Sequence, residues 1–106
     1  MHFIDSNTIS ISPISSEVPT QYNIFQNYPN PFNPTTKIKF DIPKLSYVLL
    51  TVFDVTGKAV EVLVNNKLSP GSYEYVFDAG KQSSGVYFYR IQTDDYTETK
   101  RMLLVK

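Results

Sequence analysis

Apolar and polar side chains alternate along much of this chain with the two-residue period of a β-strand. Residues 37–42 place apolar side chains on one face and charged ones on the other, and residues 73–78 alternate in a similar way. Residues 47–55 are apolar on both faces, which predicts a central strand that is covered on both sides. The remaining predicted strands are three further apolar runs, at residues 59–64, 86–91 and about 101–105.

Turn-forming sequences separate these runs at intervals of roughly ten residues, the spacing of a sandwich. Gly57 and the dipeptide Pro70-Gly71 are strong turn signals, and residues 80–85 and Asp94-Asp95 are predicted loops. No segment holds a helical period over the roughly 11 residues of an average helix. The sequence therefore predicts an all-β fold, an immunoglobulin-like antiparallel β-sandwich of about seven strands.

The composition divides the chain at about residue 20. Residues 5–20 are rich in Ser, Thr, Asn and Pro, which predicts that residues 1–20 are a linker or tether, or a weakly paired edge strand. Residues 21–106 form the predicted β-sandwich domain, and a chain of 106 residues leaves little room for a second domain. The first residues lack the basic and apolar stretches of a signal peptide. If the natural protein is exported, we therefore expect this chain to be a piece of a longer one.

Charge and cysteine content narrow the function classes. Ten Lys and Arg residues balance ten Asp and Glu residues, which argues against binding to nucleic acid or to an anionic membrane through bulk charge. The absence of cysteine excludes a disulfide scaffold and thiolate chemistry. No apolar run reaches the length of a membrane-spanning helix, so no membrane insertion is expected.

The sequence offers no catalytic constellation. His2 is the single histidine, which makes a Ser-His-Asp triad or a His-ligated metal site improbable. Asp41, Asp54 and Asp78 fall near strand ends, with nothing to indicate that they converge on a cleft. Asp94-Asp95 lacks the alternating ligand loop of a calcium site and is interpreted as a charged hairpin tip. We expect no enzyme, metal or cofactor.

Two runs rich in aromatic residues, at 73–77 and 87–89, allow two interpretations. Their side chains could form a stacking platform for sugar rings or bases, or they could be core residues and cross-strand pairs. Because aromatic residues are favoured in strands in any case, the second interpretation is the stronger one. The side chains concerned are Tyr73, Tyr75, Phe77, Tyr87 and Tyr89.

Residues 26–34, with the sequence QNYPNPFNP, are the most distinctive part of the chain. We call them the proline block. Its three prolines fix φ and lack an N–H, so neither a helix nor a central strand can pass through it. Residues that precede proline favour extended geometry, and Asn30 and Asn33 favour local turns. The proline block is therefore predicted to be a stiff, extended connector with Phe32 as an apolar anchor.

From about residue 22 to 106, the sequence resembles the type A C-terminal sorting domain of the bacterial type IX secretion system, found in Bacteroidetes and related phyla. The proline block, the strand at 36–43, the hairpin at 48–58 and the closing strand at 99–106 all match the family pattern in order. Two mild departures are Pro70, where the family has a small residue, and Arg101, where it mostly has lysine. The motif positions are Asn27, Tyr28, Pro29, Asn30, Pro31, Phe32, Asn33, Pro34, Gly57, Gly71, Tyr73, Gly85 and Tyr87.

The resemblance implies a transport role without chemistry. Such a domain directs an N-terminal cargo through the periplasm and the type IX outer-membrane machinery to the cell surface or the medium. A surface sortase then cleaves in the linker, here at roughly residues 5–21. The basic and apolar last strand supplies the candidates for recognition by the translocon: Lys100, Arg101, Met102, Leu104 and Lys106.

Two other function classes remain open at the level of sequence. One is an immunoglobulin-like module of a secreted enzyme that binds carbohydrate through exposed tyrosines or acts as a structural spacer. The other is an assembly domain, because residues 48–58 and the pattern from Gly71 to Gly80 also resemble the immunoglobulin-like domain of flagellar hook-capping proteins. The proline block favours the sorting domain, since a hook-capping domain has no reason to carry it.

Overall fold

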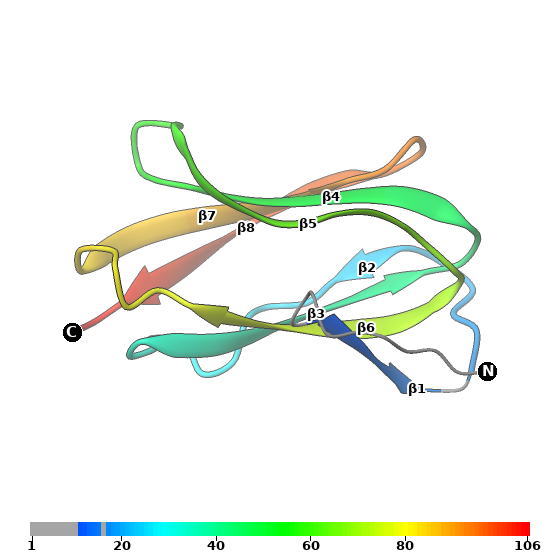
Figure 1. Cartoon of the computed structure of the whole chain (residues 1–106), viewed down its shortest axis with the longest axis horizontal. Coiled ribbons are helices and arrows are strands. Elements are labelled where there is room, and N and C mark those ends of the chain that lie inside the picture. Colours follow the sequence, from blue (N-terminus) through cyan, green and yellow to red (C-terminus); the bar gives the residue numbers. More distant parts are fainter. Residues whose placement is uncertain (1–10, 16) are drawn as a thin grey trace.

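The structure is a computed structural model that describes residues 11–15 and 17–106. In these residues, eight strands form two antiparallel sheets of four strands each, which face one another as two layers (Figure 1). The described part of the chain contains no helix, and therefore none that could span a membrane. The prediction of an all-β sandwich is confirmed, with one strand more than the approximate count of seven. The strands are β1 (Ile11–Ser15), β2 (Asn23–Ile24), β3 (Thr35–Ile42), β4 (Ser46–Phe53), β5 (Ala59–Leu68), β6 (Gly71–Asp78), β7 (Gly85–Gln92) and β8 (Thr97–Leu104).

Sheet A has the strand order β1-β6-β3-β2, and sheet B has the order β5-β4-β7-β8. Hairpins join β4 to β5 and β7 to β8 within sheet B, whereas β5 and β6 belong to different sheets. The two layers lie one above the other in Figure 1, with β4, β5, β7 and β8 in the upper layer. Strand β8 is thus an edge strand of sheet B.

The core lies between the inner faces of the two sheets. Alternate side chains of β3 and β4 point into it, and six of them are fully buried: Ile38, Phe40, Ile42, Val48, Leu50 and Val52. Phe77 and Tyr89 are also almost completely buried, and Tyr73 stacks on Phe40 with a distance of 5.6 Å between ring centroids. Tyr73 and Tyr75 are partly buried and pack against this core, so the aromatic runs belong to the core and do not form an exposed stacking platform.

Three details of the predicted strands are wrong. Strand β4 is central in sheet B, but only its inner face is fully covered, since Tyr47 on the outer face is 49% exposed. Strand β5 continues through the polar residues 65–67, because their backbone pairs with β4 while their side chains reach solvent at the sheet edge. Strand β8 begins at Thr97, four residues before the apolar run at about 101–105 from which it was predicted.

The turn at Gly57 is confirmed and has a clear local cause. Gly57 has φ of +86°, a value that residues with a Cβ rarely adopt. Asp54 holds this turn, because its Oδ1 accepts hydrogen bonds from the backbone N of Thr56 at 2.9 Å and of Lys58 at 3.1 Å. The Thr56 hydroxyl also donates to Oδ1, and these bonds lower the pKa of the Asp54 carboxyl.

Strand β1 lies at the outer edge of sheet A, where Ile11 pairs with Tyr75 of β6. The pairing is irregular between Pro13 and Ser15. Most of the predicted linker at residues 1–20 lies outside the described residues, so the boundary at about residue 20 stays a prediction.

Candidate functional site

The proline block crosses from sheet A to sheet B and then runs beside β8. On the side of sheet A, Tyr28 pairs with Lys37, with backbone N–O distances of 3.0 and 2.9 Å. On the side of sheet B, Phe32 forms a parallel bridge to Leu104. The peptide bonds that precede the three prolines are all cis, a geometry that the sequence analysis did not anticipate. The proline block therefore links the two sheets on the side of the sandwich where β2 and β8 are the edge strands.

Phe32 anchors the proline block in the core, as predicted. Its side chain is only 2% exposed, and its ring lies 6.2 Å from that of Phe77 with a tilt of 53° between the planes. Its backbone N donates to Leu103 O at 3.0 Å, and its backbone O accepts from Val105 N at 2.9 Å. One residue thus combines burial between the sheets with backbone pairing to β8.

Asn27 organises the first half of the proline block through buried hydrogen bonds. The side chain is 2% exposed, and its amide Nδ2 donates to Thr36 Oγ1 at 3.0 Å and to Pro29 O at 3.2 Å. Its Oδ1 accepts from Gln26 Nε2 at 2.7 Å. Because these partners satisfy most of the amide, Asn27 fixes the path of the chain as it leaves β2.

Tyr89 links the same segment to sheet B. Its hydroxyl donates to Phe25 O at 2.7 Å and accepts from Asn27 N at 2.8 Å. Burial raises the pKa of the Tyr89 phenol well above its ordinary value, so the hydroxyl keeps its proton and can donate. The sequence predicted that Tyr89 is a core residue but did not reveal this polar role. The only indication was the hydroxyl itself, because phenylalanine would fill a purely apolar position equally well.

Polar atoms of the proline block cover the outer edge of β8. Gln26 Nε2 donates to Arg101 O at 2.7 Å, and Leu103 N donates to Asn30 Oδ1 at 3.0 Å. Together with the two backbone bonds of Phe32, these contacts occupy outward-facing backbone groups from Arg101 to Val105. This half of β8 is therefore an edge strand whose edge is already paired within the chain.

The five candidates for recognition by the translocon fall into different environments. Met102 and Leu104 are buried in the core, so no partner can contact them while the domain is folded. Arg101 is exposed. The Lys100 ammonium is partly covered and lies 3.4 Å from the Glu98 carboxylate.

Lys106 closes the loop that precedes β7. Its Nζ donates to Gly80 O and Gln82 O, each at 2.7 Å, and its backbone N donates to Ser84 Oγ at 3.0 Å. A lysine ammonium carries three protons, so these two carbonyls leave capacity for one further acceptor. The residue is therefore part of the folded structure as well as an exposed cation.

Two motif tyrosines share one local arrangement. Tyr73 and Tyr87 each follow a glycine by two residues, at Gly71 and Gly85. The hydroxyl of Tyr73 donates to Ser69 O at 2.8 Å, and that of Tyr87 donates to Ser83 O at 2.6 Å. In both cases the phenol returns to the backbone four residues upstream, much as a tyrosine corner does. These motif positions thus stabilise the loops that lead into β6 and β7.

A third aromatic contact lies at the start of β8. Tyr22 stacks on Tyr96 with 5.2 Å between ring centroids and an angle of 8° between the planes. The Tyr96 hydroxyl donates to the Glu98 carboxylate, which together with burial raises the pKa of Tyr96 to about 12. The same hydrogen bond lowers the pKa of Glu98.

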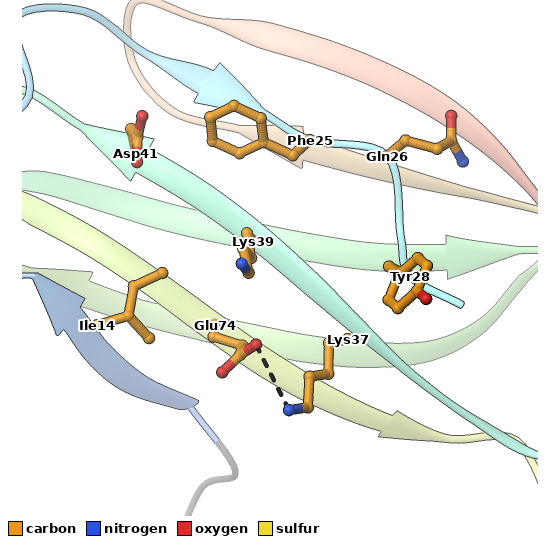
Figure 2. A pocket seen from close by; sticks show the side chains of 8 residues that line it. All are labelled: Ile14, Phe25, Gln26, Tyr28, Lys37, Lys39, Asp41 and Glu74. Carbon is orange, nitrogen blue, oxygen red and sulfur yellow. Dashed lines mark ion pairs between the residues drawn. The ribbon is translucent and has the colours of Figure 1, made fainter. Parts of the chain in front are cut away.

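The outer face of sheet A carries a shallow groove of about 620 Å³ (Figure 2). Its rims are apolar, with Phe25 and Tyr28 on the side of the proline block and Ile14 of β1 on the other. Its floor contains both signs of charge, including the ion pair of Lys37 and Glu74 at 4.0 Å. The exposed aromatic residues of this groove belong to the segment after β2, and none of them is a strand tyrosine of the predicted platform.

The three carboxylates considered for catalysis do not converge. Asp41 accepts a hydrogen bond from Ser72 Oγ at 2.7 Å, Asp78 accepts one from Gly80 N at 2.9 Å, and Asp54 holds the turn at Gly57. Within the residues that the structure describes, no group of three potential metal ligands occurs. Each of these carboxylates stabilises its own local structure.

Comparison with known families assigns the chain. A family model described as "Secretion system C-terminal sorting domain" matches residues 26–106, from the first residue of the proline block onward. No curated protein matches the sequence. Members of the matched family are in general not catalytic. Since the match spans well over half of the chain, this protein belongs to the family of type IX secretion C-terminal sorting domains.

Proposed function

We propose that this domain is the signal that directs a larger cargo protein through the type IX outer-membrane translocon to the cell surface or the medium. Membership of the family supports a C-terminal sorting role, which implies export, contact with the secretion machinery and a cargo on the N-terminal side. In this proposal the cargo first enters the periplasm, and a surface sortase later cleaves within the linker at roughly residues 5–21. The domain itself performs no chemistry.

One structural observation supports this proposal in addition to family membership. The surface around β8 is assembled from three separate parts of the sequence: the proline block, the loop at 80–84 and residues 101–106. These parts lie close together only when the sandwich is folded, because the proline block is anchored through Phe32 between the sheets. A receptor that reads this surface accepts folded cargo tags and rejects unfolded ones.

Side chains of β8 are the better candidates for recognition than its backbone. Addition of a receptor strand would need free N–H and C=O groups at the edge. Between Arg101 and Val105 the proline block already occupies such groups. We therefore assign direct contact to the exposed Arg101, supported by Lys100 and Lys106, and assign Met102 and Leu104 to holding the strand in place.

The test is a secretion assay in a bacterium with a type IX system. A fluorescent reporter is fused in front of the full chain, and its amount is measured in the periplasm and at the cell surface. Deleting the last strand would remove the buried Met102 and Leu104 and unfold the domain, so point variants are needed. Arg101→Glu should leave the reporter in the periplasm, while Lys39→Glu, which changes an exposed cation of sheet A, should not.

Each outcome decides a separate claim. Retention of the unmodified fusion in the periplasm of the type IX host would contradict the proposed function. Delivery of Arg101→Glu at the level of the unmodified tag would contradict the role given to Arg101. Circular dichroism of both purified variants must first show the spectrum of the unmodified domain.

A further inference from the structure

The outer faces of the two sheets differ in chemistry. On sheet A, the outward positions of β3 and β6 carry two lysines and three carboxylates: Lys37, Lys39, Asp41, Glu74 and Asp78. Lys37 pairs with Glu74, and Asp41 accepts hydrogen bonds from neighbouring side chains. Mixed charges that are largely paired within the sheet are typical of a face that remains in water.

The outer face of sheet B is apolar and basic. We define this face as the side chains of β4, β7 and β8 that point away from the core. They alternate along each strand with the buried core residues. None of these positions carries a carboxylate. Tyr47 and Leu103 on this face are 49% and 37% exposed. Its charged residues are Arg90 and Arg101, and within the described part of the chain neither is in an ion pair.

Arg90 lies at the centre of this face. Its guanidinium carbon lies 4.5 Å from the centroid of the Phe53 ring. In the register of the sheet, Phe88 is paired with Phe53 on one side and with Arg101 on the other. Phe53, Phe88 and Arg90 line a pocket of about 300 Å³, together with Thr99 of β8 and with Asp54, Val55 and Gly57 of the adjacent turn. The pocket thus combines two aromatic side chains with the Arg90 cation, and the Asp54 carboxylate at its border is hydrogen-bonded to Thr56 and Lys58 of the turn.

The Arg90 side chain also has an unmet hydrogen-bonding need. Its Nε is buried and has no partner among the described residues. A buried donor without an acceptor destabilises the fold. A guanidinium matches a carboxylate through two parallel hydrogen bonds, which gives strong and directional binding. The two arginines without an ion pair and the hollow beside Arg90 indicate that this face is completed by an acidic group from outside the chain.

We propose that the outer face of sheet B binds an extended acidic segment of a partner protein, with one carboxylate against Arg90 and a neighbouring apolar side chain in the pocket between Phe53 and Phe88. A second carboxylate can meet Arg101. Aromatic residues and arginine are the side chains that most often dominate binding energy at protein interfaces. The partner's place in secretion rests on the proposed function, whereas the binding itself can be measured without it.

The first experiment is a titration of the isotope-labelled full chain followed by NMR. The probes are short, blocked peptides that contain one glutamate between leucine, phenylalanine or tyrosine residues, and the same peptides with glutamine. We expect glutamate peptides to shift the amide signals of β4, β7 and β8, and we expect glutamine to weaken binding by about tenfold.

Variants separate this site from the rest of the surface. Arg90→Met keeps the apolar stem but removes both the charge and the unpaired Nε, so it should weaken peptide binding by a similar factor without lowering the melting temperature. Lys39→Met is the matched control, because it removes a cation from the outer face of sheet A and should leave binding unchanged.

Several results would overturn the proposal. These are a set of peptides that leaves the signals of sheet B unshifted, equal binding by Arg90→Met, or shifts confined to the groove of sheet A. Preferential binding of a short oligothymidylate to the same face would also overturn it, in favour of a nucleic-acid site. A reporter fusion with Arg90→Met then tests delivery, and if the unmodified fusion is not delivered, the proposed function fails while the titration still decides this inference.

Discussion

Replacing Phe32 with alanine tests whether the proline block is part of the core or a loop laid on its surface. The side chain is 2% exposed, between the two sheets and beside Phe77. Truncating a buried phenylalanine removes its transfer free energy and leaves a cavity, at a cost of about 3–5 kcal/mol. Loss of the pair with Phe77 is part of that figure, at about 0.5–1.5 kcal/mol.

This cost is large for a domain of this size. A chain of about 100 residues has a free energy of unfolding of about 5–15 kcal/mol, so Phe32→Ala should remove a substantial part of it. With a shift of about 4–8 °C for each kcal/mol, the melting temperature should fall by at least about 12 °C. Urea unfolding followed by circular dichroism measures the first quantity, and a thermal scan measures the second.

Phe25 provides the matched control. It lies just before the proline block but is 43% exposed at the rim of the groove, so Phe25→Ala should cost less than about 1 kcal/mol. The reasoning would be refuted if Phe32→Ala cost as little as this, or if both variants lost the same stability. Either result would mean that the proline block does not clamp the two sheets.

Three further changes have defined outcomes. Tyr89→Phe should cost about 1–3 kcal/mol in urea unfolding, because the backbone groups that its hydroxyl satisfies stay buried, whereas Tyr47→Phe at an exposed position should cost much less. Gly57→Ala should cost about 1–2 kcal/mol through backbone strain at φ of +86°, since no atom obstructs the added methyl group; an unchanged melting temperature would refute this. The lowered pKa values of Asp54 and Glu98 mean that both carboxylates stabilise the fold above their ordinary pKa values of 3.8 and 4.5. This stabilisation is lost as the pH falls through the lowered values, so the melting temperature should drop in acid, and it should drop less in Glu98→Gln.

The sequence was sufficient to predict the sandwich where side-chain alternation and burial agree. Residues 37–42 alternate strictly, and their apolar members are buried in β3 as expected. Side-chain alternation does not predict strands at sheet edges, where backbone pairing continues although the side chains are polar. Residues 65–67 are the example, since they extend β5 without contributing any buried apolar surface. Strand β2 was missed because two residues carry no detectable period.

The candidate site was predictable only in outline. The sequence identified the proline block, its anchor Phe32 and the last strand as important. It could not show that Gln26 and Asn30 bond to the backbone of β8, because these contacts join residues more than 70 positions apart. It also could not separate the exposed Arg101 from the buried Met102, because both lie in one short stretch whose register on the sheet is set by β7.

The pairing of the proline block with β8 has a consequence for how these domains behave at high concentration. An open strand edge invites identical chains to add to one another and to grow into fibres. Here β1 has Pro13 and an irregular register, β2 is two residues long, β5 has two register shifts and carries Lys67, and half of β8 is covered. Each of these features makes it harder for a second copy of the domain to add to a strand edge.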